Sequence, residues 1–276
     1  MRISNKDRVI VITGASSGIG AATALACAAE GMHVVLAARR QTRLASLARQ
    51  IQDLGRQALV VPCDVDQDEA VAHLCNLTVN EFGRLDVFFA NAGFGLFGSV
   101  LDTPLQQVRA IFETNFFGTV RGIKAAVPLM LDRNPGPIRG HVLICCSAAS
   151  EIGLPMFSYY SATKAAQDSI AGGLRAELAD QGIRVSSIHP IGTRTEFFDR
   201  AAERSGTPSG HNTPRIFAHS PRRVARHIVR CLRRPRPEVW PSTATRLALA
   251  LGTASPRLGA LFMRSIYRRH EKSIRG

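Results

Sequence analysis

Short apolar runs alternate with longer amphipathic stretches along the first two thirds of the chain. The apolar runs are rich in β-branched residues, as strands buried in a sheet are. They are Val9–Thr13, His33–Ala37, Ala58–Pro62, Val87–Ala90, His141–Cys146 and Val185–His189. The stretches between them have helical patterns and are long enough to cross between parallel strands. These are Ile19–Glu30, Thr42–Leu54, Asp68–Phe82, Pro104–Leu131 and Ser158–Asp180.

This alternation predicts an α/β fold, a single doubly wound domain of the Rossmann type. Residues 193–220 break the pattern with glycines and prolines among polar residues, which favours a lid beside a site. A basic helix, Pro221–Leu232, and a last strand near Val239 follow. We therefore expect a catalytic domain over residues 1–240 with a seven-strand parallel sheet, and a helical C-terminal extension over residues 241–276.

The charge of the chain changes the interpretation of this extension. The net charge is +14, and residues 194–276 hold 18 Lys and Arg against 5 Asp and Glu, a net of +13. The apolar runs Leu247–Leu251 and Leu258–Met263 are flanked by arginines, a composition suited to an anionic membrane surface. A solvated surface and a cap over the substrate pocket are the alternatives. Nucleic-acid binding is disfavoured, because Tyr267 is the only aromatic residue among the terminal arginines after Phe262, and no recognised binding motif is present.

The compartment is suggested by the cysteines and by the beginning of the chain. Six scattered cysteines include no Cys-x-x-Cys pair, which is typical of reduced, buried thiols. The short polar stretch before Arg8 does not have the pattern of a secretory or transit peptide, and no apolar run is long enough to cross a bilayer. We expect a cytoplasmic protein, with membrane association only at a surface.

A glycine-rich turn follows the first strand directly, with the sequence Gly14-Ala-Ser-Ser-Gly18-Ile-Gly20 before a helix. Glycine permits tight turns, and the N–H groups at a helix start can bind a pyrophosphate. The spacing differs from the Gly-x-Gly-x-x-Gly fingerprint, so by itself the loop is equally consistent with a purely structural turn.

The end of the second strand indicates which dinucleotide would bind. An acidic residue there accepts the ribose hydroxyls of NAD, whereas this chain reads Ala37-Ala38-Arg39-Arg40. Arginine binds a 2′-phosphate. The sequence therefore predicts NADP(H), with Arg39 as the main phosphate ligand and Arg40 assisting. The alternative is a pair of solvated arginines that open a helix.

Tyr160 and Lys164 lie four residues apart on a predicted helix, so both side chains share one face. The pKa of a free phenol is about 10, and a nearby ammonium lowers it toward the range that acid–base catalysis needs. The chain has only 4 lysines against 31 arginines, which makes this lysine notable. Tyr159 has no lysine at that spacing. Alone the pair would favour a surface helix, but it follows the fifth strand of a nucleotide-binding pattern.

Taken in order, these motifs resemble those of the short-chain dehydrogenase/reductase family, over residues 8 to about 195. The resemblance rests on Thr13-Gly14-x-x-x-Gly18-x-Gly20 and Tyr160-x-x-x-Lys164. It implies a catalytic set of Ser147, Tyr160, Lys164 and Asn115. In that set Ser147 polarises the substrate carbonyl and Asn115 holds a water that links the lysine to solvent. It also implies cofactor contacts by Gly14, Ser16, Ser17, Gly18, Ile19, Gly20, Arg39, Arg40, Asp64, Val65, Asn91, Ala92, Gly93, Tyr160, Lys164, Pro190, Thr193 and Thr195.

One departure from the family pattern lies after the sixth strand. The family usually has Pro-Gly before an aliphatic residue and a threonine, whereas this chain has Pro190-Ile191-Gly192-Thr193-Arg194-Thr195. No metal is implied. The resemblance predicts hydride transfer between NADP(H) and a carbonyl or alcohol, with Tyr160 as the general acid and base, in a homodimer or homotetramer. Phenylalanines near the predicted site favour an apolar small-molecule substrate. The alternative is a non-catalytic protein of this fold that binds a cofactor, a membrane surface or a partner.

Overall fold

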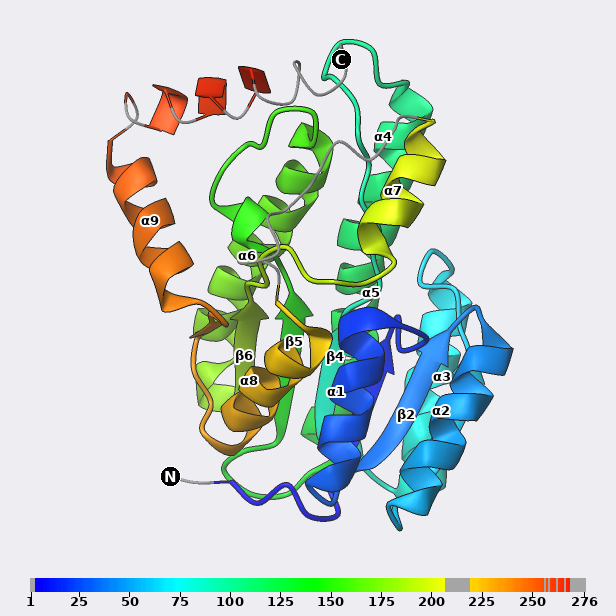
Figure 1. The fold of residues 1–276 in the computed structure, drawn as a ribbon. Helices are drawn as coiled ribbons and strands as arrows, with labels where there is room; N and C mark the ends of the chain where they lie inside the picture. Colours follow the sequence, from blue (N-terminus) through cyan, green and yellow to red (C-terminus); the bar gives the residue numbers. More distant parts are fainter. Residues whose placement is uncertain are drawn as a thin grey trace.

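Seven parallel strands form one sheet in the order β3-β2-β1-β4-β5-β6-β7 (Figure 1). The computed structural model describes residues 3–206 and 219–255, and beyond them residues 257, 259–261, 263–265, 267 and 268. The strands are β1 (Val9–Thr13), β2 (His33–Ala38), β3 (Ala58–Pro62), β4 (Val87–Ala90), β5 (Gly140–Cys145), β6 (Ile183–Ile188) and β7 (Glu238–Val239). The doubly wound α/β fold predicted from the sequence is confirmed.

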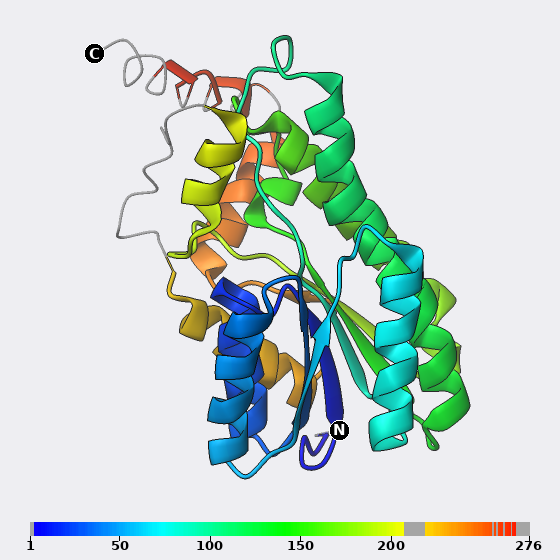
Figure 2. The ribbon, with the colours of Figure 1, turned by 90° about the vertical axis from the view of Figure 1, so that its right-hand side faces the viewer.

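Helices cover both faces of the sheet (Figure 2). They are α1 (Gly18–Ala29), α2 (Gln41–Asp53), α3 (Asp68–Phe82), α4 (Leu105–Phe112), α5 (Gly118–Arg133), α6 (Ser158–Glu177), α7 (Phe197–Ser205), α8 (Pro221–Arg233) and α9 (Thr243–Ala254), with short turns η1 (Glu113–Phe117), η2 (Ala148–Ser150) and η3 (Ala179–Gln181). Helices α1, α2 and α8 pack on one face, and α3, α5 and α6 on the other. None of the described helices is both long and apolar enough to cross a membrane.

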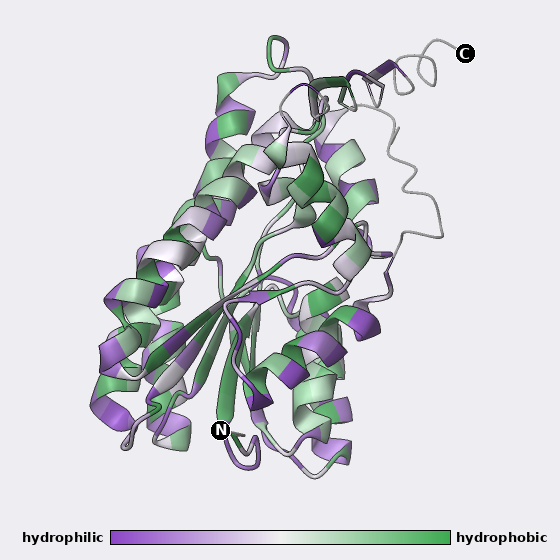
Figure 3. Cartoon of the chain, turned by 90° about the vertical axis from the view of Figure 1, so that its left-hand side faces the viewer, coloured by the Kyte–Doolittle hydropathy of each residue, from purple (hydrophilic) through white to green (hydrophobic). Residues whose placement is uncertain are grey.

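The core lies in two layers because successive strand residues point to opposite faces of the sheet. In β1, Ile10 and Ile12 are buried with α1 and α8, whereas Val9 and Val11 are buried with α3 and α5. Both faces are covered, so the strand residues are mostly apolar (Figure 3). This burial explains why most strands are visible in the sequence as apolar runs.

Two segments differ from the sequence expectation. The predicted helix over residues 104–131 divides into α4 and α5 around a π-helical turn, η1, in which the Asn115 side chain bonds the backbone of Phe94. The predicted lid contains a helix, α7, and residues 207–218 of the lid lie outside the described residues.

Candidate active site

The candidate site is a cavity of about 1530 Å³ at the carboxyl ends of the strands, beside the point where the strand order reverses between β1 and β4. Ligands bind in this crevice in open α/β sheets. Most of the residues expected from the sequence line it. These are Gly14, Ser16, Ser17, Gly18, Ile19, Arg39, Arg40, Asp64, Val65, Asn91, Ala92, Gly93, Ser147, Tyr160, Lys164, Pro190, Thr193 and Thr195. Gly20 and Asn115 do not line the cavity; Asn115 is fully buried and Gly20 is buried in α1.

The glycine loop is a cradle that only glycine permits at two positions. A Cβ on Gly14, whose φ is +64°, would lie 2.9 Å from the Cα of Ala92, and a Cβ on Gly20 would lie 2.6 Å from the carbonyl oxygen of Gly14. Ser17 and Gly18 line the cavity at the start of α1, where the helix has a partial positive charge. This cradle fits the pyrophosphate of a dinucleotide.

The arginines after β2 lie at one end of the same cavity. Arg40 donates from Nε to Ser16 Oγ at 3.1 Å and from Nη2 to Ser17 Oγ at 2.7 Å. Arg39 is more exposed, and its Nη1 lies 3.6 Å from Asp64 Oδ2. The sequence favoured Arg39 as the main phosphate ligand, whereas in the structure Arg40 is the arginine that contacts the glycine loop.

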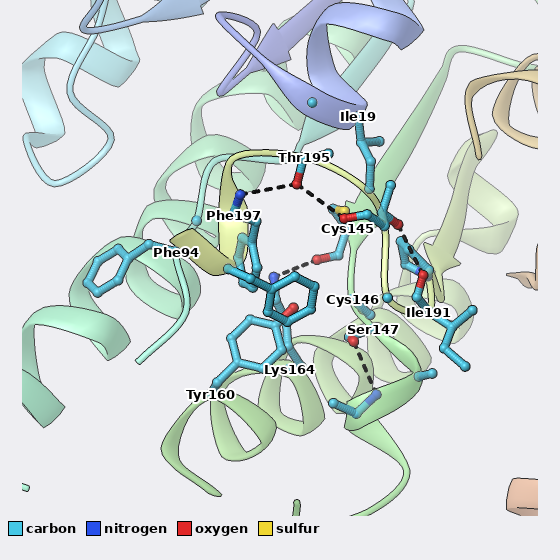
Figure 4. A pocket seen from close by; sticks show the side chains of 18 of the residues that line it. Ile19, Phe94, Cys145, Cys146, Ser147, Tyr160, Lys164, Ile191, Thr195 and Phe197 are labelled. Atoms are coloured by element: carbon cyan, nitrogen blue, oxygen red, sulfur yellow. Dashed lines mark hydrogen bonds between the residues drawn. The ribbon is translucent and has the colours of Figure 1, made fainter. Parts of the chain in front are cut away.

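Ser147 and Tyr160 meet at the other end of the cavity. Ser147 lies two residues after the end of β5, and its Oγ accepts a hydrogen bond from the Ala149 amide at 3.1 Å, which orients the hydroxyl. The hydroxyls of Ser147 and Tyr160 share a hydrogen bond. The Tyr160 ring packs against Phe157 and Phe197, with ring centroids 4.5 Å and 5.3 Å away (Figure 4). These two hydroxyls therefore face one apolar space together.

Lys164 is buried on the same face of α6 as Tyr160. Its Nζ lies 5.6 Å from the Tyr160 ring centroid and donates to the Cys145 carbonyl at 2.7 Å and to Gln167 Oε1 at 2.8 Å. Gln167 Nε2 in turn donates to the backbone carbonyl of Asn115 at 2.7 Å. Gln167 therefore connects the lysine to the backbone of Asn115, and the water through which the resemblance links the lysine to solvent stays a prediction.

Burial controls the protonation of this pair. It raises the pKa of Tyr160 well above the ordinary value for a phenol and lowers the pKa of Lys164. The sequence predicted that the lysine ammonium would lower the pKa of the phenol. The structure differs because desolvation outweighs every other influence on Tyr160, and the ammonium is bound to Cys145 and Gln167.

His189 is a further polar group beside the site. The sequence had placed this residue only at the end of a strand. Its Nδ1 lies 3.2 Å from the Ser147 carbonyl oxygen, and its Nε2 lies 2.9 Å from Ser187 Oγ. Its ring stacks on Trp240 with centroids 4.3 Å apart. The imidazole therefore holds the backbone turn that carries the Ser147 hydroxyl.

The C-terminal extension contributes to the wall of the cavity. The lining includes Thr245, Ala248, Leu249 and Gly252 of α9. Small and apolar residues recur three to four positions apart in this helix, a signal that could have placed it against the pocket. The sequence left three alternatives for the extension, one of which was a purely solvated surface. Because α9 lines the cavity, the extension is more than such a surface.

The family model for short chain dehydrogenases matches residues 8–206. The chain therefore belongs to the short-chain dehydrogenase/reductase family. It is an oxidoreductase of that family, acting on alcohol or carbonyl groups with a nicotinamide dinucleotide, NAD(H) or NADP(H). Proteins of this family bind small-molecule substrates and commonly form oligomers.

Similar proteins come from distant organisms. The chain is 31% identical over 263 residues to the uncharacterized oxidoreductase YxnA of Bacillus subtilis, covering 95% of this chain and 72% of that protein. It is 30% identical over 277 residues to dehydrogenase/reductase SDR family member 7B of Xenopus tropicalis, covering 97% of this chain and 88% of that protein.

Solved structures give the same picture. A short-chain type dehydrogenase/reductase from Mycobacterium marinum superposes with a TM-score of 0.74 at 30% identity, covering 83% of this chain and 89% of that one. An alcohol dehydrogenase from the archaeon Thermococcus sibiricus, complexed with 5-hydroxy-NADP, superposes with a TM-score of 0.71 at 28% identity, covering 82% and 90%.

Proposed function

We propose that this chain transfers hydride between NADP(H) and a carbonyl or alcohol substrate, with Tyr160 as the proton-transfer residue. The observation that carries the choice of cofactor is the position of Arg40, whose guanidinium lies on Ser16 and Ser17 of the glycine loop. Arg39 lies beside it, and β2 ends without an acidic residue that would repel a 2′-phosphate. The solved alcohol dehydrogenase with 5-hydroxy-NADP supports the same choice.

The remaining cofactor contacts are those that the family resemblance implies, and the residues concerned line the cavity. Asp64 and Val65 would contact the adenine, and the turn at Asn91-Ala92-Gly93 would contact the ribose. Pro190, Thr193 and Thr195 would hold the nicotinamide amide. When bound, the dinucleotide supplies or accepts the hydride.

The residues of the chain position the substrate oxygen and move its proton. A carbonyl oxygen between Ser147 and Tyr160 would accept a hydrogen bond from each hydroxyl, which polarises the carbon toward hydride. Tyr160 then donates its proton as the alkoxide forms. Burial raises the pKa of Tyr160, so at neutral pH the phenol holds a proton that it can donate to the alkoxide. Lys164 keeps a positive charge on the side of the forming tyrosinate.

The substrate is proposed to be apolar. Aromatic and aliphatic side chains surround the space in front of Tyr160, and they include Phe94, Leu154, Phe157, Phe197, Phe198, Leu249 and Met263. Pockets of this kind bind small apolar ligands and orient them through a few polar groups.

A reductase assay with NADPH tests this function. Medium-chain aliphatic aldehydes and ketones are compared with polar sugars of similar size, on the wild type and on Tyr160→Phe. We expect NADPH oxidation with the apolar carbonyls and loss of at least a hundredfold in Tyr160→Phe. Binding of NADPH without turnover of any carbonyl would instead favour the non-catalytic alternative.

A peripheral membrane contact is a second proposal, favoured by the surface of the C-terminal extension. Leu247, Leu251 and Leu261 are 64%, 72% and 64% exposed, and Arg246 and Arg264 lie among them. Apolar residues with flanking arginines bind anionic lipid surfaces. Co-sedimentation with vesicles of phosphatidylglycerol, but not phosphatidylcholine, and release by salt is the expected result. Equal recovery in the supernatant with both vesicles would contradict it.

A homodimer or homotetramer through the helices that begin near Pro104 and Ser158 is also proposed. Gly172 and Gly173 on α6 leave an open face, because a Cβ on either would meet only a side-chain tip, at 3.8 Å and 3.6 Å. Light scattering during size-exclusion chromatography would show a mass of two or four chains, whereas a mass near 29.9 kDa would refute the assembly.

A further inference from the structure

Glu196 lies in the midst of three arginines at the phosphate end of the cavity. Its Oε2 accepts from Arg40 Nη1 at 3.1 Å and from Arg200 Nε at 2.9 Å, and its Oε1 accepts from Arg43. Arg40 and Arg43 belong to the beginning of α2, more than 150 residues away in sequence. The carboxylate therefore ties the segment before α7 to the arginines that follow β2.

This carboxylate has the chemistry of the anion that the same corner is built to bind. A carboxylate and a phosphate both present oxygen acceptors to the guanidinium fork. The bonds to Arg43 and Arg40 lower the pKa of Glu196 to about 2, so the group is ionised at neutral pH. One side of the Arg40 guanidinium holds Ser16 and Ser17, and the other holds Glu196.

The balance of charges in this corner favours replacement of the Glu196 carboxylate by a phosphate. Among the described residues, arginines outnumber acids here: Arg39, Arg40, Arg43, Arg200 and Arg204 stand against Asp64, Asp66 and Glu196. A 2′-phosphate carries a charge of about −1.5 to −2, which is larger than that of one carboxylate. An entering 2′-phosphate would therefore compete with Glu196 for Arg40 and Arg43.

The neighbours of Glu196 connect this corner to the rest of the site. Thr195 lies against the glycine loop, where its Cγ2 is 3.1 Å from the position of a Cβ on Gly18. Phe197 packs on the Tyr160 ring. A movement of the Glu196 backbone would therefore displace side chains at both the glycine loop and Tyr160.

We propose that Glu196 occupies the 2′-phosphate site from within the chain and is displaced by the 2′-phosphate of NADP(H), so that it sets the strength and selectivity of 2′-phosphate binding. This inference rests on the proposed NADP(H) dependence. Glu196 acts here as an internal competitor: it neutralises the arginines when the site is empty, and its release is part of the cost of binding the phosphate.

The test measures binding of two nucleotides that differ only in the 2′-phosphate. Adenosine 2′,5′-bisphosphate and 5′-AMP are titrated calorimetrically into the full chain, as wild type, Glu196→Gln and Glu203→Gln. Glu203 lies on α7 and is exposed, so its variant removes the same charge elsewhere on the lid segment. Thermal melting confirms that each variant is folded, and Glu196→Ala is a second variant at the same position.

In Glu196→Gln we expect the bisphosphate to bind about two- to fivefold more tightly, the size of one partly exposed charge interaction. The affinity for 5′-AMP should change less than twofold, and Glu203→Gln should leave both affinities unchanged. The gain should shrink at high salt. Unchanged or weaker bisphosphate binding in Glu196→Gln would overturn the inference and make Glu196 a support for Arg40.

The two proposals fail in distinguishable ways. Wild type that binds 5′-AMP as tightly as the bisphosphate would refute the NADP(H) proposal itself. Wild type that prefers the bisphosphate, together with a Glu196→Gln variant that does not tighten it, would refute only the role of Glu196.

Discussion

Gly20→Ala should damage the glycine loop through a single methyl group. The new Cβ would lie 2.6 Å from the Gly14 carbonyl oxygen and 2.7 Å from Asn91 Nδ2, whereas ordinary contact begins at 3.4 Å. The separation from each of these atoms must therefore grow by about 0.7–0.8 Å. Asn91 Nδ2 donates to both the Thr13 and Gly14 carbonyls, so the movement also strains those bonds.

Opposing effects set the size of the stability loss. Overpacking costs about 1–3 kcal/mol and a weakened buried hydrogen bond about 0.5–1.5 kcal/mol, while alanine is better than glycine in a helix by about 1 kcal/mol. We expect a net loss of about 1–3 kcal/mol, and each kcal/mol lowers the Tm by about 2–4 °C in a domain of this size. Circular dichroism during heating measures the change.

The binding arm of this experiment separates loop damage from general destabilisation. Ala22→Gly lies in the same helix and costs about 1 kcal/mol through helix propensity alone, without a new clash. NADPH binding by calorimetry should weaken about tenfold in Gly20→Ala and stay unchanged in Ala22→Gly. A Gly20→Ala protein with the wild-type Tm and wild-type NADPH affinity would refute the argument from close packing.

Three further outcomes follow from burial and hydrogen bonding. Tyr160→Phe should abolish carbonyl reduction yet bind NADPH, while Tyr159→Phe, which loses only a bond to a loop carbonyl, should keep near-normal activity in the same assay. Burial lowers the pKa of His141 to about 3, against about 6.5 in the unfolded chain. The neutral His141 contributes fully to the free energy of unfolding above pH 6.5, and about 2 kcal/mol of that free energy is lost when the pH falls to 5. Urea unfolding at pH 7 and pH 5 should show this loss, and the loss should be smaller in His141→Asn. Burial raises the pKa of Cys27 to about 12, and all six thiols are buried, so maleimide labelling should require unfolding, and rapid labelling of the native protein would contradict this.

Most strands could be predicted from the sequence because they are buried on both faces and their residues are therefore mainly apolar. The helix boundaries also agreed within a few residues, except over residues 104–131. There a π-helical turn separates α4 from α5. One extra residue in a helical turn hardly changes the pattern of apolar positions. The π-helical turn accompanies a tertiary contact of Asn115 with Phe94. The local sequence therefore did not reveal the turn.

The residues around the cavity could be named from the sequence, but their partners could not. Arg39 and Arg40 are equivalent as sequence, and the direction of each side chain depends on the backbone where α2 begins, with Arg40 at φ −87° and ψ 85°. Glu196 was not selected at all. Asp199 and Glu203 lie close to it in sequence, so nothing singles it out, and its partners Arg40 and Arg43 become neighbours only when β2 and β6 lie in one sheet.

The pKa of Tyr160 could not be predicted from the spacing of Tyr160 and Lys164 in the sequence. A tyrosine and a lysine four residues apart indicate a tyrosinate held by an ammonium, if both groups face water. In the structure both are buried, which favours the neutral form of each, and the pKa values move in opposite directions. Gln167, three residues further along α6, accepts a hydrogen bond from the Lys164 Nζ. Burial thus shifts the pKa of both groups, and the spacing of the two residues in the sequence could not express this effect.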